Sequence, residues 1–114
     1  MSYTGIDISH WNRARDWGAI SEVVNFAFIK AAGEERGIGS YRKDVCFEKF
    51  YYDCKEHSIP VGCYFFMGNQ RDLLYRGPGE VVEKLLDQIS RLELDMPIVI
   101  DCEAQFVTNK FYVG

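Results

Sequence analysis

Two kinds of hydrophobic pattern alternate along this chain. Short runs of apolar residues, rich in β-branched and aromatic side chains, predict four buried strands. These runs cover residues 4–9, 25–30, 61–67 and 97–101. Between the runs, apolar residues recur every three or four positions, which predicts amphipathic helices. We expect helices after an Asp16 N-cap, from Val45 to about Glu56 after an Asp44 cap, and from Pro78 to about Leu94. The glycine-containing segment 31–43 is a predicted loop.

The order of these elements, β-α-β-α-β-α-β, predicts an α/β fold with parallel strands and right-handed crossovers. Four such units are half of an eight-stranded, TIM-like barrel, so we expect a single, incomplete barrel domain covering residues 1–114. An open half-barrel exposes two sheet edges and one apolar face. The sequence therefore predicts a homodimer that pairs through these edges, or a chain that is a fragment of a longer one.

Composition narrows the function class. The 114 residues carry a net charge of −4 and are 47% hydrophobic, with 15% aromatics, which excludes a disordered segment. Mild acidity and the lack of Lys/Arg clusters argue against nucleic-acid binding. No segment has the pattern of a signal peptide or a membrane span, so we expect synthesis in the cytoplasm and no membrane partner. The four cysteines lack zinc-site spacing and are expected to be reduced, structural thiols, with no metal or cofactor.

The most informative segment is the last strand, Pro97-Ile98-Val99-Ile100-Asp101-Cys102-Glu103. Strand side chains alternate faces, so Asp101 and Glu103 are expected on one side, about 6–7 Å apart along the strand. Two acids at the end of a buried parallel strand are costly without a function. A carboxylate pair at such a separation is what glycosidic bond cleavage requires, with Glu103 as the proton donor. Metal ligation and a salt bridge with Lys30 are the alternative interpretations.

Other strands add polar residues at the same predicted edge. Asp7 ends the first strand, Lys30 the second, and Tyr64 lies in the third. Asp7 would hold Asp101 or substrate, Tyr64 would offer its hydroxyl, and Lys30 would face the same opening or serve as a counterion. Trp11, just after the first strand, is either a stacking platform for a sugar or a packed rim residue. A core position for Tyr64 also stays open, and the nearby His10 is interpreted as a structural loop histidine.

These residues together resemble the family 25 glycoside hydrolases, the N-acetylmuramidases of phage endolysins, bacterial autolysins and some fungi. The matching segments are Gly5-Ile6-Asp7-Ile8-Ser9-His10-Trp11-Asn12, Asp16-Trp17, Phe26-Ala27-Phe28-Ile29-Lys30-Ala31, Pro60-Val61-Gly62-Cys63-Tyr64-Phe65-Phe66 and Pro97 to Glu103. They occur in the family's order and span almost the whole chain. The resemblance implies the N-terminal half of a muramidase domain, since the family's domain is much longer.

The resemblance also implies a function. The expected activity is cleavage of the β-1,4 bond between N-acetylmuramic acid and N-acetylglucosamine in peptidoglycan, on the cell wall after release. Glu103 matches the family's proton donor, Asp101 and Asp7 match two other essential acids, and Tyr64 matches a substrate-lining tyrosine. The chain departs from the family where Ala32-Gly33-Glu34 replaces a threonine-glutamate-glycine motif, and where Phe65 replaces a frequent histidine. The alternative function is a peptidoglycan-binding or interaction module without hydrolysis.

Overall fold

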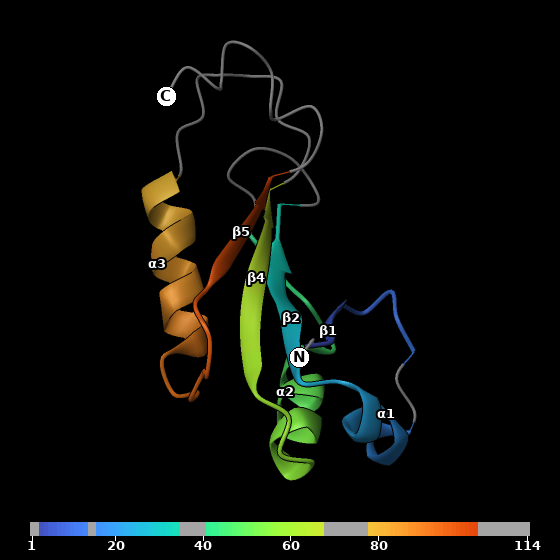
Figure 1. Ribbon diagram of the computed structural model, residues 1–114. Coiled ribbons are helices and arrows are strands. Elements are labelled where there is room, and N and C mark those ends of the chain that lie inside the picture. Colours follow the sequence, from blue (N-terminus) through green and yellow to red (C-terminus); the bar gives the residue numbers. More distant parts are fainter. Residues whose placement is uncertain (1–2, 14–15, 35–40, 68–77, 103–114) are drawn as a thin grey trace.

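The structure is a computed structural model that describes residues 3–13, 16–34, 41–67 and 78–102 (Figure 1). Strands and helices alternate as the hydrophobic pattern predicts. The elements are β1 (Gly5–Ile8), α1 (Trp17–Val23), β2 (Phe26–Gly33), β3 (Arg42–Lys43), α2 (Phe47–Glu56), β4 (Val61–Met67), α3 (Pro78–Ile89) and β5 (Val99–Cys102). Among the residues described, no helix is long and apolar enough to cross a membrane.

The sheet is parallel and open, which confirms the predicted fold class. Its strand order is β1-β2-β4-β5, and each neighbouring pair along this path is parallel. Chain order therefore becomes spatial order, with β1 and β5 at the two ends of the described sheet. All carboxyl ends of these strands meet at one edge, where β/α barrels place their chemistry.

The core lies between the sheet and the helices. Alternate strand residues face the helices and are fully buried, among them Ile29, Val61 and Phe65. On α3 the buried positions Val81 and Leu85 recur at helical spacing. Burying one such aliphatic or aromatic side chain contributes about 1.5–3 kcal/mol. The other core members are Ile8, Trp17, Ala27, Ala31, Ala32, Phe47, Phe50, Tyr51, Cys54, Ile59, Cys63 and Ile89.

Helix ends follow the sequence in one case and depart from it in another. Asp16 caps α1 as predicted, since its Oδ1 accepts the Ala19 N–H at 2.9 Å. The second helix begins at Phe47 and not at Val45, after a turn at residues 45 and 46 that follows Asp44. Its Oδ1 accepts the Cys46 N–H at 2.8 Å, and its Oδ2 accepts from His10. The N-cap residue of α2 makes no side-chain cap bond.

The predicted loop 31–43 is wrong in part. The second strand continues to Gly33, because Ala32 and Gly33 pair with Phe65 and Phe66 of β4 on one side. On the other side they pair with the two-residue β3, which is antiparallel to β2. The register between β2 and β4 shifts between Lys30 and Ala32, which marks a β-bulge.

Two further boundaries differ from the prediction. The third helix ends at Ile89, since the Leu92 N–H bonds to the Ile89 carbonyl in a turn at 2.9 Å, instead of continuing to Leu94. The last strand starts at Val99 and not at Pro97. The predicted further element at 106–113 lies outside the described residues.

The sheet face opposite the core depends on glycines. A Cβ on Gly62 would lie 2.7 Å from Cε1 of Phe28, and a Cβ on Gly5 would lie 2.0 Å from Cε2 of Phe26. Gly62 is the direct register partner of Phe28. The missing side chains leave room for these aromatic rings to lie over the neighbouring strands, and Phe28 thereby reaches the candidate site.

Candidate active site

Two acids predicted from the sequence lie at the carboxyl-terminal edge of the sheet. Asp7 comes from β1 and is exposed, whereas Asp101 comes from β5 and is half-buried. Their strands are separated by β2 and β4, so the acids approach the site from its two sides. Glu103, the predicted proton donor, lies outside the described residues. The expected pairing of Asp101 with Glu103 on one face therefore stays a prediction.

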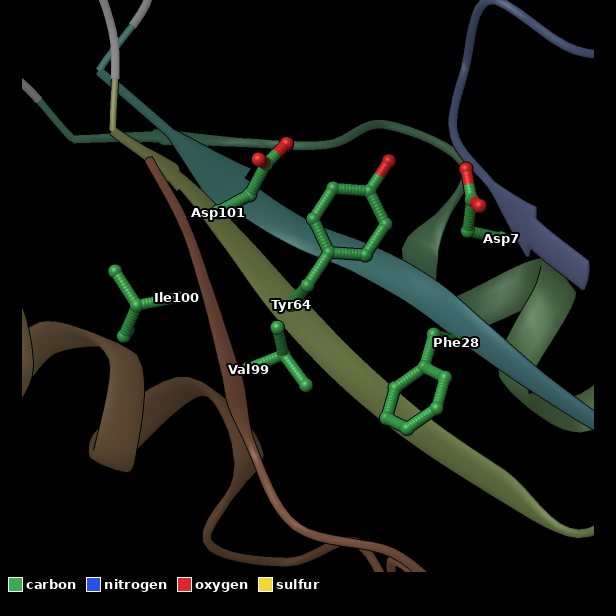
Figure 2. A pocket seen from close by; sticks show the side chains of 6 residues that line it. All are labelled: Asp7, Phe28, Tyr64, Val99, Ile100 and Asp101. Carbon is green, nitrogen blue, oxygen red and sulfur yellow. The ribbon is translucent and has the colours of Figure 1, made fainter. Parts of the chain in front are cut away.

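A pocket of about 440 Å³ joins the two acids. It is lined by Asp7, Phe28, Tyr64, Val99, Ile100 and Asp101. Figure 2 shows the Tyr64 ring between the two acids, with its hydroxyl on the same side as their carboxylates. Phe28 and Val99 line the lower part of the pocket. The site thus has a polar rim of three oxygen-bearing groups and an apolar floor, an arrangement typical of small-molecule sites.

The negative charges of Asp7 and Asp101 both act on the Tyr64 hydroxyl. Burial is the main cause that raises the pKa of its hydroxyl to about 12, and the negative charge of Asp7 adds to it. A side-chain hydrogen bond with Ser9 lowers the pKa, while Asp101 and Asp44 raise it further. The phenol therefore stays protonated at physiological pH and can donate a hydrogen bond. Its position inward, at the site, favours the substrate-facing interpretation over a core tyrosine.

Lys30 is brought next to the site but does not line the pocket. It is the register partner of Tyr64 across β2 and β4, and its side chain is 5% exposed. The ammonium Nζ lies 5.3 Å from the centroid of the Phe66 ring, within cation–π range. Gly33 packs against it, since a Cβ there would lie 3.1 Å from Cε of Lys30. The charge is thus held on the pocket face of the sheet, beside the lining residues and close to the β-bulge.

Trp11 is outside the pocket lining but close to it. Its side chain is 78% exposed, which contradicts a packed rim tryptophan and leaves the ring accessible to a ligand. The adjacent His10 contacts it, with ring centroids 4.6 Å apart. Sequence reasoning missed a partner for His10, because Asp44 follows it by 34 residues. It also missed Ser9 and Phe28, although both lie within the segments that carry the family resemblance.

The fold and the site together define a class. Parallel strands with helices on one face, and a carboxylate-rimmed pocket at the carboxyl ends, form part of a β/α barrel of the kind that glycoside hydrolases use.

Comparison with solved structures is more specific. The chain is similar to a family 25 glycosyl hydrolase from Bacillus anthracis, at 23% identity and a TM-score of 0.62, over 95% of this chain and 46% of that one. It is also similar to a bacterial lysozyme from Streptomyces coelicolor, at 27% identity and a TM-score of 0.62, over 89% of this chain and 45% of that one. A third similar structure is a muramidase from Acremonium alcalophilum, at 20% identity and a TM-score of 0.63, over 90% of this chain and 47% of that one.

These matches confirm the resemblance predicted from the sequence at the level of the fold. The chain spans slightly less than half the length of the three structures. No family model matches the sequence, and no curated protein matches it.

Proposed function

We propose that this chain carries part of the active site of a peptidoglycan hydrolase. The reaction is cleavage of the β-1,4 bond between N-acetylmuramic acid and N-acetylglucosamine in bacterial cell walls, and glycan strands are the partner. The observation that carries the proposal is the Tyr64 hydroxyl lying between Asp7 and Asp101 in one pocket. The likeness to solved structures described as a lysozyme and a muramidase supports it.

Each acid has a proposed role. Glycosidic cleavage needs a carboxylic acid that protonates the leaving oxygen and a negative group that stabilises the oxocarbenium-like centre. Glu103 is the proposed proton donor. Asp101 stabilises the positive charge or orients the N-acetyl group of the sugar, and Asp7 holds Asp101 or substrate from the opposite side.

The remaining residues bind the saccharide. Tyr64 donates its hydroxyl, which its raised pKa keeps protonated. Phe28 and Val99 supply an apolar floor for the C–H face of a sugar ring. Trp11 extends this surface as a stacking platform, and Lys30 contributes positive charge from beside the pocket.

The test is lysis of cell-wall suspensions, followed as loss of turbidity. Glu103→Gln is expected to abolish lysis and to leave wall binding intact, and Asp101→Asn to lower the rate strongly. The matched control is Glu22→Gln, which changes an exposed acid of α1 far from the pocket and should leave lysis unchanged. Lysis by Glu103→Gln at the wild-type rate would refute the assignment of the proton donor.

A second candidate is a peptidoglycan-binding module without hydrolysis. The observation that favours it is the polar rim of the pocket, where Asp7, Tyr64 and Asp101 can hydrogen-bond a saccharide without cleaving it. Wild-type protein that sediments with purified walls but never reduces their turbidity would establish this alternative.

We propose homodimerisation through the β5 side of the sheet. Ile98, Val99 and Ile100 are each 36–45% exposed there. On α3, which precedes β5 in the chain, Val82 and Leu86 are 46% and 50% exposed. Exposed apolar side chains at a sheet edge favour association. A monomeric mass by light scattering at micromolar concentration would contradict this proposal.

A further inference from the structure

The loop after β1 is held in one conformation by short hydrogen bonds. The Asn12 N–H donates to the Ser9 carbonyl at 2.9 Å, and Oδ1 of Asn12 accepts the Ser9 N–H at 2.9 Å. The Trp11 N–H donates to Oγ of Ser9 at 3.2 Å. This closed set of bonds fixes where the two rings of His10 and Trp11 stand relative to the end of the strand.

A buried carboxylate orients the His10 ring. The Asp44 side chain is completely buried, and its Oδ2 lies 2.6 Å from Nδ1 of His10. The same oxygen accepts the His10 N–H at 2.9 Å. An ionised carboxylate only accepts hydrogen bonds, so the proton of the neutral imidazole resides on Nδ1. In this neutral tautomer Nε2 carries a lone pair and can accept a hydrogen bond.

The accessible edge of the imidazole is the one that carries Nε2. The His10 side chain is 25% exposed, and its Nδ1 edge faces a carboxylate with no exposure. What remains accessible is the opposite edge of the ring. The imidazole also contacts Trp11, with the two ring centroids 4.6 Å apart and the ring planes tilted by 40°. The two rings make a continuous surface with one hydrogen-bond acceptor on it.

This surface adjoins the pocket. Ser9 links the loop to the pocket, because its hydroxyl accepts the backbone N–H of Trp11 and is hydrogen-bonded to the pocket residue Tyr64. A saccharide chain leaving the pocket on the β1 side would therefore meet these rings next.

We propose that His10 is a further substrate-binding residue, whose Nε2 accepts a hydrogen bond from a hydroxyl of a saccharide unit stacked on Trp11. Asp44 is the positioning residue that fixes the tautomer and orientation of the ring. This inference rests on the proposed function, because it requires a saccharide in the adjoining pocket. It assigns a second saccharide position to the loop after β1, beyond the acids and Tyr64.

The experiment separates ligand contact from a structural role. In the Glu103→Gln background, which prevents turnover, binding of tetra-N-acetylchitotetraose is measured by calorimetry. His10→Asn is the informative variant, because the amide nitrogen of asparagine can replace Nδ1 as donor to Asp44 while the Nε2 edge is lost. The expected result is a Kd weakened roughly three- to tenfold, the effect of one lost hydrogen bond. The urea unfolding midpoint should not change.

His57→Asn is the matched control. This second histidine ends α2, and its Nδ1 lies 2.9 Å from the Asp53 carbonyl. It precedes β4 and thus lies at the amino-terminal end of the strands, away from the pocket. The substitution should leave saccharide affinity unchanged.

Asp44→Asn tests the positioning role. It should weaken binding and alter the ¹⁵N shifts of the His10 imidazole, because an amide no longer fixes the proton on Nδ1. If this variant does not fold, the saccharide affinity of His10→Asn alone decides whether the inference holds. Wild-type affinity in His10→Asn, with saccharide binding lost in Asp101→Asn, would overturn this inference and leave the proposed function standing. A parent protein that binds no saccharide would overturn both.

Discussion

Replacing Gly62 with alanine tests how the sheet supports the pocket. A Cβ at this position would lie 2.7 Å from Cε1 and 2.9 Å from Cδ1 of Phe28, and 3.2 Å from Cβ of Met96. The ring of Phe28 must move, yet Met96 Cβ restricts how far the new methyl group can retreat. Overpacking of this kind costs about 1–3 kcal/mol. We expect Gly62→Ala to lower the free energy of unfolding by that amount and to disturb the pocket floor.

Gly18→Ala is the control with the opposite sign. Gly18 lies in α1, and a Cβ there would meet only Oδ1 of Asp16 at 3.4 Å, an ordinary contact. Alanine has the higher helix propensity, so this variant should gain up to about 1 kcal/mol. Urea unfolding followed by circular dichroism measures both variants at pH 7. The same chemical change should therefore act in opposite directions at the two sites.

A double-mutant cycle identifies the cause. If the clash with the Phe28 ring is responsible, Phe28→Leu should recover part of the stability lost in Gly62→Ala, and the two effects should not add. Equal stability of Gly62→Ala and wild-type protein would refute the argument that the glycine is required by the ring above it. Strict additivity would place the clash elsewhere, at Met96.

Three further predictions concern titration, accessibility and capping. Burial raises the pKa of the Cys54 thiol to about 12, whereas the unfolded thiol ionises near 9.0, so stability should fall as pH rises through this window. Cys54→Ala should flatten that dependence in urea titrations between pH 8 and 10, and an unchanged slope would contradict it. In a Cys102→Ser background, Ellman's reagent should label the half-buried Cys46 quickly, and the buried Cys54 and Cys63 only on unfolding. Asp16→Ala should cost about 0.5–2 kcal/mol, measured by thermal unfolding, since it removes the cap of α1.

The parts of the fold that the sequence predicted are those set by local pattern. Continuous apolar runs marked β1, β2, β4 and β5, and Asp16 marked the start of α1 through a contact only three residues away. Parallel order followed from the alternation of strands and helices. Boundaries were less accurate where pairing with a distant strand decides. The second strand extends to Gly33 because Phe65 and Phe66 pair with its end.

The residues of the candidate site also differ in how well the sequence predicts their positions. Asp7, Tyr64 and Asp101 were predictable, because each lies at the carboxyl end or inward face of a strand whose direction the topology fixes. Lys30 also lies on the pocket face of the sheet, as the register partner of Tyr64, but its ammonium packs over Phe66 near the bulge that follows it, so Lys30 does not line the pocket. A bulge depends on how two strands are paired, and no local pattern in this segment signals it.

The pair of His10 and Asp44 shows the limit most clearly. Local reasoning gave Asp44 the role of a helix cap and gave His10 no partner, and each assignment was sound for a residue taken with its neighbours. The sheet brings the two together across 34 positions, and the carboxylate then serves His10 as well as the Cys46 N–H. Its burial makes it costly unless it is fully hydrogen-bonded, and the imidazole supplies the strongest of those bonds. The buried Asp44 carboxylate thus holds the His10 ring in one orientation. A ligand-binding site needs such a fixed orientation when Nε2 has to face the ligand.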